Sequence, residues 1–325
     1  MAKKILITGA GGFIGSHLTE LCVEAGYEVR AFLRYNSKNQ WGWLEESKCK
    51  NDVEVIAGDI RDFDSVAGAM KGCGAVFHLA ALIGIPYSYV SPLAYIKTNV
   101  EGTYNVLQAA KEFGLGNVLI TSTSETYGTA RNIPIDENHP LVGQSPYSAS
   151  KISADQLAIS YFRSFDTPVK IVRPFNAYGP RQSARAVIPT IVTQILSGRK
   201  ELALGNVHPT RDLTFVRDTA SAFIEIFKSD RLFGEIVNVG TNQEISIKEL
   251  AGTIAGLMKA DISIATEGRR VRPDKSEVDR LRCDNSKILA RTGWKPRTDL
   301  KKGLRETISW LKKHLESYKP GIYNV

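Results

Sequence analysis

Near its start the chain reads Thr8-Gly9-Ala10-Gly11-Gly12-Phe13-Ile14-Gly15, directly after an apolar stretch, Lys4–Thr8, that has the character of a strand. In Gly9-x-x-Gly12-x-x-Gly15 the first glycine allows a tight turn, the second lets backbone approach a pyrophosphate, and the third lets a helix pack on a strand. An amphipathic stretch at Phe13–Glu24 and a strand-like stretch at Glu28–Leu33 follow. This β-α-β pattern predicts a dinucleotide site with the phosphates at a helix N-terminus.

Strand-like and helical stretches continue to alternate beyond this unit. The expected strands are Val53–Ile56, Ala75–Leu79, Val118–Ser122 and Val169–Val172, and the expected helices are Asp62–Met70, Tyr95–Phe113 and Tyr147–Tyr161. Such alternation predicts an α/β fold with a doubly wound, Rossmann-like parallel sheet and a smaller, mixed α/β C-terminal lobe. We assign residues 1–178 to the dinucleotide-binding domain, to which 214–240 return, and residues 179–213 and 241–325 to the second lobe.

Composition excludes several classes of protein. The chain of 325 residues is 43% hydrophobic and 23% charged, which is typical of a folded globular protein. It contains no apolar run long enough to cross a membrane and no signal-type leader, so a cytoplasmic location is expected. Its four cysteines and five histidines lack metal-ligand spacing, so no metal is expected. The net charge of +8 comes without a basic run interleaved with aromatics, which favours an anionic small substrate over nucleic acid.

A tyrosine and a lysine four residues apart form the main catalytic candidate. In Tyr147-Ser148-Ala149-Ser150-Lys151 both side chains share one face of the expected helix. The ammonium of Lys151 would then favour the ionised form of the Tyr147 phenol, which suits a general acid/base. Together with the glycine turn, this pair indicates a redox enzyme.

The end of the second expected strand bears on the choice of cofactor. An NAD site of this fold usually places a carboxylate there to bind the ribose hydroxyls. Here the strand runs into Arg34, Tyr35, Asn36 and Ser37. A guanidinium can pair with a 2′-phosphate, so NADP is favoured. The alternative is that Arg34 stacks over adenine and the enzyme uses NAD.

Further motifs along the chain resemble one known family. Gly58-Asp59-Ile60, His78-Leu79-Ala80-Ala81 and Thr98-Asn99-Val100, with the glycine spacing, are similar to the extended short-chain dehydrogenase/reductase family, also called the epimerase/dehydratase family. The predicted cofactor-binding residues are Gly9, Gly12, Phe13, Ile14, Gly15, Arg34, Asn36, Ser37, Asp59, Ile60, Leu79, Ala80, Ala81, Asn99, Tyr147, Lys151 and Pro174.

The resemblance implies the chemistry. Thr123 and Tyr147 would hold a sugar oxygen, Tyr147 would take the O4 proton as hydride leaves C4, and Lys151 would fix the cofactor ribose. Glu125 is then a candidate base for the C5 proton, after which water can leave C6. dTDP-glucose 4,6-dehydratases have Thr-Asp-Glu at this site, whereas this chain has Ser124 in the middle. Because serine is a poor acid, either a water relayed through Ser124 or Glu125 itself must protonate the departing oxygen.

Longer stretches resemble the N-acetylglucosamine-nucleotide 4,6-dehydratases of legionaminic acid biosynthesis. They are Tyr35-Asn36-Ser37 with Trp41-Gly42-Trp43-Leu44, Ile85-Pro86-Tyr87-Ser88-Tyr89 and the stretch from Arg181 to Thr190. The resemblance implies GDP- or UDP-N-acetylglucosamine as substrate. The rivals are a C4 epimerase and a UDP-glucuronate decarboxylase, which also carries a similar Thr-Ser-Glu. A catalytically silent dinucleotide-binding regulator is the alternative from another class, and the intact Thr123, Tyr147 and Lys151 argue against it.

Family resemblance also implies the substrate clamp and the assembly. Asn176 would donate to the diphosphate, and Arg211 and Arg272 match positions that grip the two phosphates. The predicted substrate-binding residues are Tyr87, Thr123, Asn176, Arg185, Val187, Leu204, Arg211 and Arg272. The helices expected at Tyr95–Phe113 and Tyr147–Tyr161 imply a homodimer through a four-helix bundle.

Overall fold

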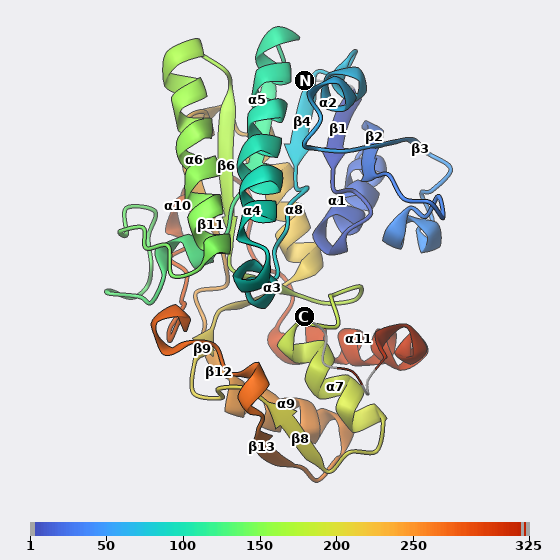
Figure 1. The fold of residues 1–325 in the computed structure, drawn as a ribbon, viewed down its shortest axis with the longest axis vertical. Coiled ribbons are helices and arrows are strands. Elements are labelled where there is room, and N and C mark those ends of the chain that lie inside the picture. Colours follow the sequence, from blue (N-terminus) through green and yellow to red (C-terminus); the bar gives the residue numbers. More distant parts are fainter. Residues whose placement is uncertain (1–3, 320–321, 323–325) are drawn as a thin grey trace.

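Seven parallel strands form one sheet at the centre of the larger domain (Figure 1). The structure, a computed structural model, describes residues 4–319 and 322. The strand order is β3-β2-β1-β4-β5-β6-β11. The strands are β1 (Lys4–Thr8), β2 (Glu28–Arg34), β3 (Val53–Gly58), β4 (Ala75–His78), β5 (Asn117–Thr121), β6 (Val169–Pro174) and β11 (Ile236–Val239).

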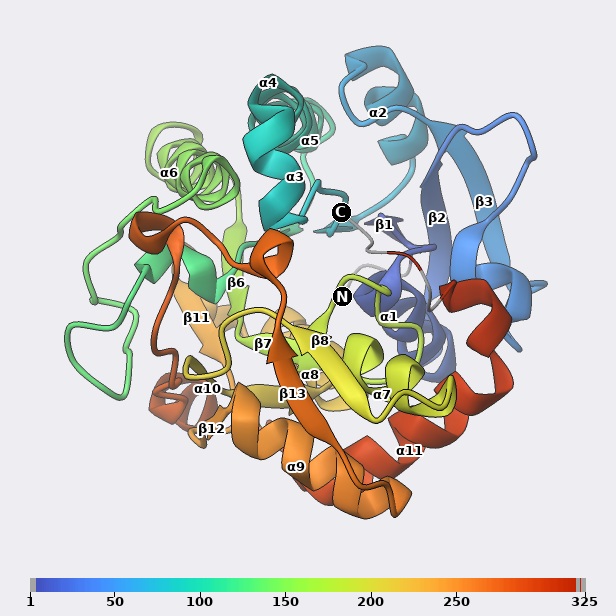
Figure 2. The ribbon, with the colours of Figure 1, turned by 60° about the horizontal axis from the view of Figure 1, so that its bottom comes forward.

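Helices cover both faces of this sheet, as the alternating pattern predicted (Figure 2). One layer contains α1 (Phe13–Glu24), α8 (Val216–Lys228) and α10 (Ser286–Arg291), and the other contains α2 (Phe63–Met70), α5 (Gly102–Glu112) and α6 (Pro146–Phe165). In β1, Ile5 and Ile7 pack into the first layer and Leu6 into the second. Successive side chains of a strand point to opposite faces, so a strand that is buried on both sides must be apolar throughout.

The long helix expected at Tyr95–Phe113 is present, and a π-helical turn lies within it. The structure has α3 (Ile85–Val90), α4 (Pro92–Tyr95), a π-helical turn η2 (Ile96–Glu101) and then α5. Within this turn the carbonyl of Asn99 accepts a hydrogen bond from the Thr103 hydroxyl at 2.6 Å. π-turns occur often at functional sites, and periodicity alone does not reveal them.

The smaller lobe lies beyond the carboxyl ends of the strands (Figures 1 and 2). Its core packs three helices against a parallel strand pair: α7 (Val187–Leu196), α9 (Ile247–Met258), α11 (Leu300–Lys313), β8 (Glu201–Leu204) and β13 (Ser263–Thr266). Two further strand pairs are β7 (Asn176–Tyr178) with β10 (Leu213–Phe215) and β9 (Thr210–Arg211) with β12 (Ile245–Ser246). The predicted fold class, a doubly wound sheet with a smaller mixed lobe, is confirmed, although β8 and β13 were not foreseen.

One stretch assigned to the lobe packs elsewhere. Ile288 of α10 and Trp294 lie in the sheet core with α1 and α8, so this part of 241–325 packs on the larger domain. β11 and α8 join the larger domain. The remaining short helical turns are η1 (Gly42–Glu46), η3 (Ser124–Tyr127), η4 (Asp230–Leu232), η5 (Gly268–Arg270), η6 (Asp274–Ser276) and η7 (Leu315–Tyr318).

Three expectations of absence concern the whole molecule. Within residues 4–319 and 322, no helix is long and apolar enough to cross a bilayer. The same described residues contain no cluster of three or more His, Cys, Asp or Glu side chains that could hold a metal ion. All four cysteines are buried free thiols.

Candidate active site and cofactor cleft

A cleft of about 1510 Å³ lies between the larger domain and the lobe. It opens at the carboxyl ends of the strands, between the neighbouring strands β1 and β4, where the strand order reverses because the chain crosses from β3 back to the other side of β1. Open α/β sheets bind their ligands at such a switch point. The predicted cofactor, catalytic and substrate residues all line this cleft, with Asn99 as the exception among the described residues.

Asn99 holds the cleft wall from behind. Its side-chain amide donates to the carbonyl of Leu82 and to the Ser150 hydroxyl, each at 2.9 Å, and its Oδ1 accepts from the Leu82 amide at 2.9 Å. The residue is 1% exposed. Its hydrogen-bonding groups are engaged in fixing the loop after β4, so the structure places Asn99 behind the cleft wall, and its contact with cofactor stays a prediction.

The glycine turn is shaped to receive a pyrophosphate. Gly9 has a φ of +71°, which a side chain would disfavour. A Cβ on Gly15 would overlap the Gly9 carbonyl oxygen. The first turn of α1 carries no acidic side chain, so its backbone amides and the helix dipole favour an anion. These features fit a dinucleotide.

The far end of the cleft is rimmed by the end of β2. Arg34 is exposed there and Ser37 lines the same rim. Asn36 is engaged in the turn itself, since it donates to the Gln40 carbonyl at 2.8 Å and accepts from the Gln40 amide at 3.0 Å. The side chain of Asn36 therefore stabilises the turn at the rim, and its hydrogen-bonding atoms are already engaged there. A hydrogen-bonded Arg61 lowers the pKa of Asp59 to about 2, so Asp59 is a carboxylate.

Tyr147 and Lys151 lie side by side on α6, where a Ser145 capping box begins the helix. Burial lowers the pKa of Lys151 to about 8, and its ammonium donates to the Thr121 carbonyl at 2.5 Å. Burial also raises the pKa of Tyr147, with the neighbouring Thr123 acting to lower it. Removal from water raises the pKa of the phenol more than the Thr123 hydrogen bond lowers it. The effect of the Lys151 ammonium on the phenol stays a prediction.

The triplet after β5 forms the floor of the cleft. Thr123 caps the short turn η3, and its hydroxyl oxygen accepts from the Glu125 amide at 3.2 Å. Ser124 and Glu125 are buried in the same turn and line the cleft. The charge of Glu125 acts on the Tyr147 phenol, so the two groups share one electrostatic environment. The carboxylate of Glu125, the phenol of Tyr147 and the ammonium of Lys151 thus line the same cleft, as acid–base chemistry requires.

Opposite the triplet, two arginines share one carboxylate. Arg211 and Arg272 approach Glu277 at 3.6 and 3.5 Å. Burial lowers the pKa of Arg211, and the positive charge of Arg272 acts in the same direction. Glu125 and Asp279 also act on Arg211 with their negative charge. The two guanidinium groups nevertheless present paired N–H donors, which suit a diphosphate. Asn176 lines this part of the cleft and its Oδ1 has no hydrogen-bond partner among the described residues.

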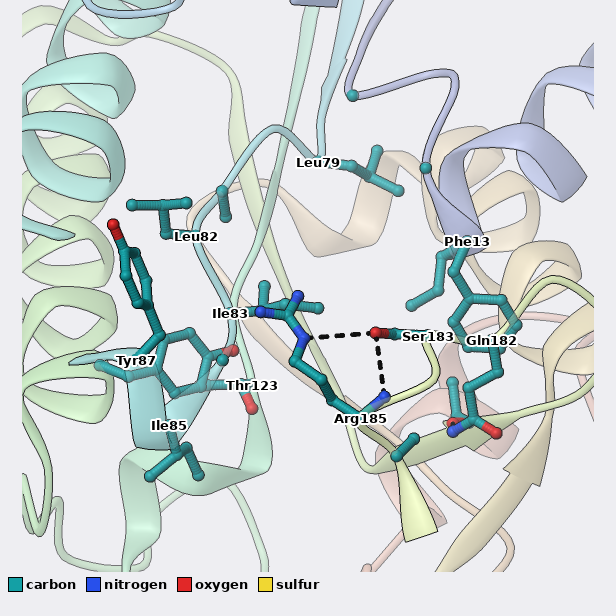
Figure 3. Close-up of a pocket in the computed structure, with 18 of the residues that line it drawn as sticks. Phe13, Leu79, Leu82, Ile83, Ile85, Tyr87, Thr123, Gln182, Ser183 and Arg185 are labelled. Atoms are coloured by element: carbon teal, nitrogen blue, oxygen red, sulfur yellow. Dashed lines mark hydrogen bonds between the residues drawn. The ribbon is translucent and has the colours of Figure 1, made fainter. Parts of the chain in front are cut away.

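The remaining wall comes from the loop before α7 (Figure 3). Arg185 projects between the Thr123 side and the Ser183 side of the cleft, and its Nε donates to the Ser183 hydroxyl at 3.3 Å. Its guanidinium lies over Gly84, where a Cβ would approach Nη1 to 3.0 Å. Tyr87 faces the same space from α3. Val187 and Leu204 extend this wall towards the far side of the lobe.

Several lining residues escaped prediction. Glu277, Ser183 and Gln182 come from loops of the lobe, and Trp41 comes from the segment after β2. Glu277 lies five positions after Arg272, which was the only hint that the two would meet. Spacing within a loop does not predict which side chains are in contact. The sequence did hint at Trp41, because it belongs to the Trp41-Gly42-Trp43 motif that carries part of the family resemblance.

Comparison with known proteins gives consistent matches along the chain. The family described as GDP-mannose 4,6 dehydratase matches residues 6–307. The chain is 31% identical to a putative UDP-glucose 4-epimerase of Methanocaldococcus jannaschii, covering 95% of this chain and 98% of that protein. It is 30% identical to human dTDP-D-glucose 4,6-dehydratase, covering 98% and 92%. A double mutant of dTDP-glucose 4,6-dehydratase from Streptomyces venezuelae, solved with NAD, superposes with a TM-score of 0.88 at 28% identity over 97% and 99%.

Proposed function

The chain belongs to the GDP-mannose 4,6 dehydratase family, within the extended short-chain dehydrogenases/reductases, and from that premise we propose that it is a nucleotide-sugar 4,6-dehydratase. The convergence of Tyr147, Lys151 and Glu125 in one cleft carries this proposal. The first two account for oxidation at C4, which epimerases also require. Glu125 adds the base that an elimination needs, although it would also fit the decarboxylase alternative.

Each side chain has one task in the proposed reaction. When bound, the nicotinamide supplies hydride transfer, out of C4 and back to C6, so no net redox change results. Thr123 holds the sugar O4 while Tyr147 takes its proton, and Lys151 orients the ribose. A 4-keto group acidifies the C5 hydrogen, which Glu125 removes. Either Glu125 or a water held by Ser124 protonates the departing C6 oxygen, and C5 takes a proton back as hydride adds to C6, so the net change is the loss of one water.

The substrate follows from the arginine pair and from sequence resemblance. The paired guanidinium groups of Arg211 and Arg272 support a diphosphate. The stretch from Arg181 to Thr190, which resembles the legionaminic acid dehydratases, supports N-acetylglucosamine linked to GDP or UDP. Arg185 and Tyr87 would contact the sugar.

The cofactor is a nicotinamide dinucleotide. Its NADP form, which Arg34 favours, stays a proposal, and the NAD bound by the Streptomyces venezuelae relative supports the alternative. Measuring the dinucleotide that co-purifies separates the two. Stoichiometric NAD would contradict the argument from Arg34.

A homodimer is the proposed assembly. Val90, Leu93, Ile96 and Tyr104 are exposed apolar side chains along α3, α4, η2 and α5, and Phe165 is exposed at the end of α6. Soluble monomers seldom expose apolar residues in such number on one pair of neighbouring helices. A second copy of the chain would cover them in a four-helix bundle.

The deciding experiment is incubation of purified protein with UDP- and GDP-N-acetylglucosamine, followed by mass spectrometry. We expect loss of one water from one of the two substrates. If no water is lost and the C4 epimer appears, the protein is an epimerase. Loss of carbon dioxide from UDP-glucuronate would instead identify the decarboxylase.

A further inference from the structure

A buried ion pair lies behind the predicted catalytic residues. Arg173, near the end of β6, donates from Nε and Nη2 to Oδ2 of Asp155 at 3.0 and 2.8 Å. The two side chains are 1% and 0% exposed. Neither is among the described residues that line the cleft, so the reaction derived above assigns them no task.

This pair is a poor device for stability alone. Oδ1 of Asp155 and Nη1 of Arg173 are buried, and the described part of the chain offers neither a hydrogen-bond partner. Removing two charges from water costs several kcal/mol, and an incompletely bonded pair recovers less of that cost. Apolar residues of similar volume often serve as well or better in such a position. The pair therefore calls for another explanation.

Asp155 is linked to the catalytic residues through the backbone and through side chains. It follows Lys151 by one helical turn and Tyr147 by two, on the same face of α6. Its Oδ2 also accepts from the Ser122 hydroxyl at 2.7 Å. Ser122 stands between Thr121, whose carbonyl receives the Lys151 ammonium, and Thr123. One carboxylate thus holds the strand end that supplies both groups.

We propose that Asp155, clamped by Arg173 and Ser122, is a positioning residue that fixes the strand end at Thr121–Thr123 and sets the charge balance at Lys151 and Tyr147. This role rests on the proposed function, because it acts through the residues assigned to C4 oxidation. Arg173 balances Asp155, so that the carboxylate does not dominate the field at Tyr147.

The charges of Asp155 and Arg173 predict in which direction the pKa values of Lys151 and Tyr147 should move. Burial lowers the pKa of Lys151 to about 8, and the negative charge of Asp155 opposes that shift. Burial raises the pKa of Tyr147, and Asp155 adds to that rise in a small way. Loss of the carboxylate should therefore lower both values, and loss of the Arg173 cation should raise both. The other titratable or charged groups around Lys151, Tyr147 and this pair are His78, Tyr95, Glu125, Tyr127 and Glu137.

The test uses two substitutions of opposite charge effect. In purified enzyme, the ¹³Cε NMR signal of Lys151, assigned with Lys151→Met, is followed against pH. We expect Asp155→Asn to lower the ammonium midpoint by about one pH unit and Arg173→Gln to raise it. With substrate, the pH profile of kcat/KM should move in the same two directions. Tyr161→Phe, on the same helix but bonded to Gln108 at 2.8 Å, is the matched control and should leave the midpoint in place.

Each outcome decides the matter. Midpoints that stay fixed, or that move in the same direction in both variants, would overturn the proposal in favour of a purely structural pair. If the single variants do not fold, the apolar pair Asp155→Leu with Arg173→Met replaces them. In that double variant the two opposite charge effects offset each other, so its readout is kcat/KM instead of the midpoint. A folded double variant that keeps the kcat/KM of the unaltered enzyme would show that the strand end at Thr121–Thr123 needs no such anchor, and the proposal would be wrong. The NMR readout needs no turnover, so a wrong substrate assignment is distinguished from a wrong role for Asp155.

Discussion

The wall of the cleft that comes from the sheet domain and the wall that comes from the lobe are built from different material. The first consists of strand ends and the buried face of α6, and it carries Thr123, Tyr147 and Lys151. The second consists of loops and two-residue strands, and it carries Arg185, Arg211 and other polar groups. Rigid elements suit chemistry that tolerates little displacement, whereas loops can vary with the substrate.

The largest effect is expected on the sheet wall. Tyr147→Phe removes the acid/base group and should lower kcat by about a thousandfold, within the usual range for such groups. Dinucleotide binding should persist, because the glycine turn is untouched. Steady-state kinetics and fluorescence titration of the cofactor measure the two. Turnover at the unaltered rate would refute the assignment, and Tyr161→Phe serves again as control.

A substitution on the lobe wall should weaken binding of the nucleotide sugar. Arg211→Met removes one of the two guanidinium groups next to Glu277, so affinity for the nucleotide sugar should fall by about ten- to a hundredfold. The rate at saturation should change much less, because Arg211 acts on the diphosphate and not on the reacting carbons. Calorimetric titration and kcat measure the two. Arg217→Met, which breaks an exposed ion pair with Glu24, is the control. If Arg211→Met lowers only kcat and leaves affinity unchanged, then the lobe wall takes part in the chemistry and not in substrate binding.

The pH profile of kcat/KM tests the role of Lys151 on the sheet wall. Because burial lowers the pKa of Lys151 to about 8, its ammonium is present below that pH and is lost as pH rises through it. We expect kcat/KM to decline above about pH 8, by roughly tenfold for each further unit. A profile that stays flat to pH 10 would show that the charge of Lys151 is not needed.

The smallest effect concerns the contact that joins the two parts of the molecule. Trp43 of η1 meets Trp310 of α11 edge to face, with ring centroids 5.2 Å apart. Trp43 also donates its backbone amide to the Gly11 carbonyl at 3.0 Å, so the glycine turn is linked to the lobe. A double-mutant cycle with Trp43→Leu and Trp310→Leu should give a coupling of about 1 kcal/mol in denaturant unfolding. Additive effects would mean that the rings stabilise the two parts independently.

The sequence alone determined the features that depend on near neighbours along the chain. The glycine turn, the alternation of strands and helices, and the Tyr147–Lys151 pair all follow from spacings of a few residues, which backbone geometry converts directly into structure. The parallel sheet follows in turn, and it brings strand ends that are distant in sequence to one edge. For this reason the cleft could be predicted before any contact was known.

The tertiary structure decided what depends on residues far apart in the chain. Spacing did not reveal that Asp155 would meet Arg173, that Glu277 would be shared by two arginines, or that Asn99 would bond to the loop after β4 instead of facing the cleft. Spacing also did not reveal that Tyr147 would be buried, and this burial raises the pKa of its phenol. Local pattern thus indicated which groups are candidates for the chemistry, and long-range packing set their surroundings and their position.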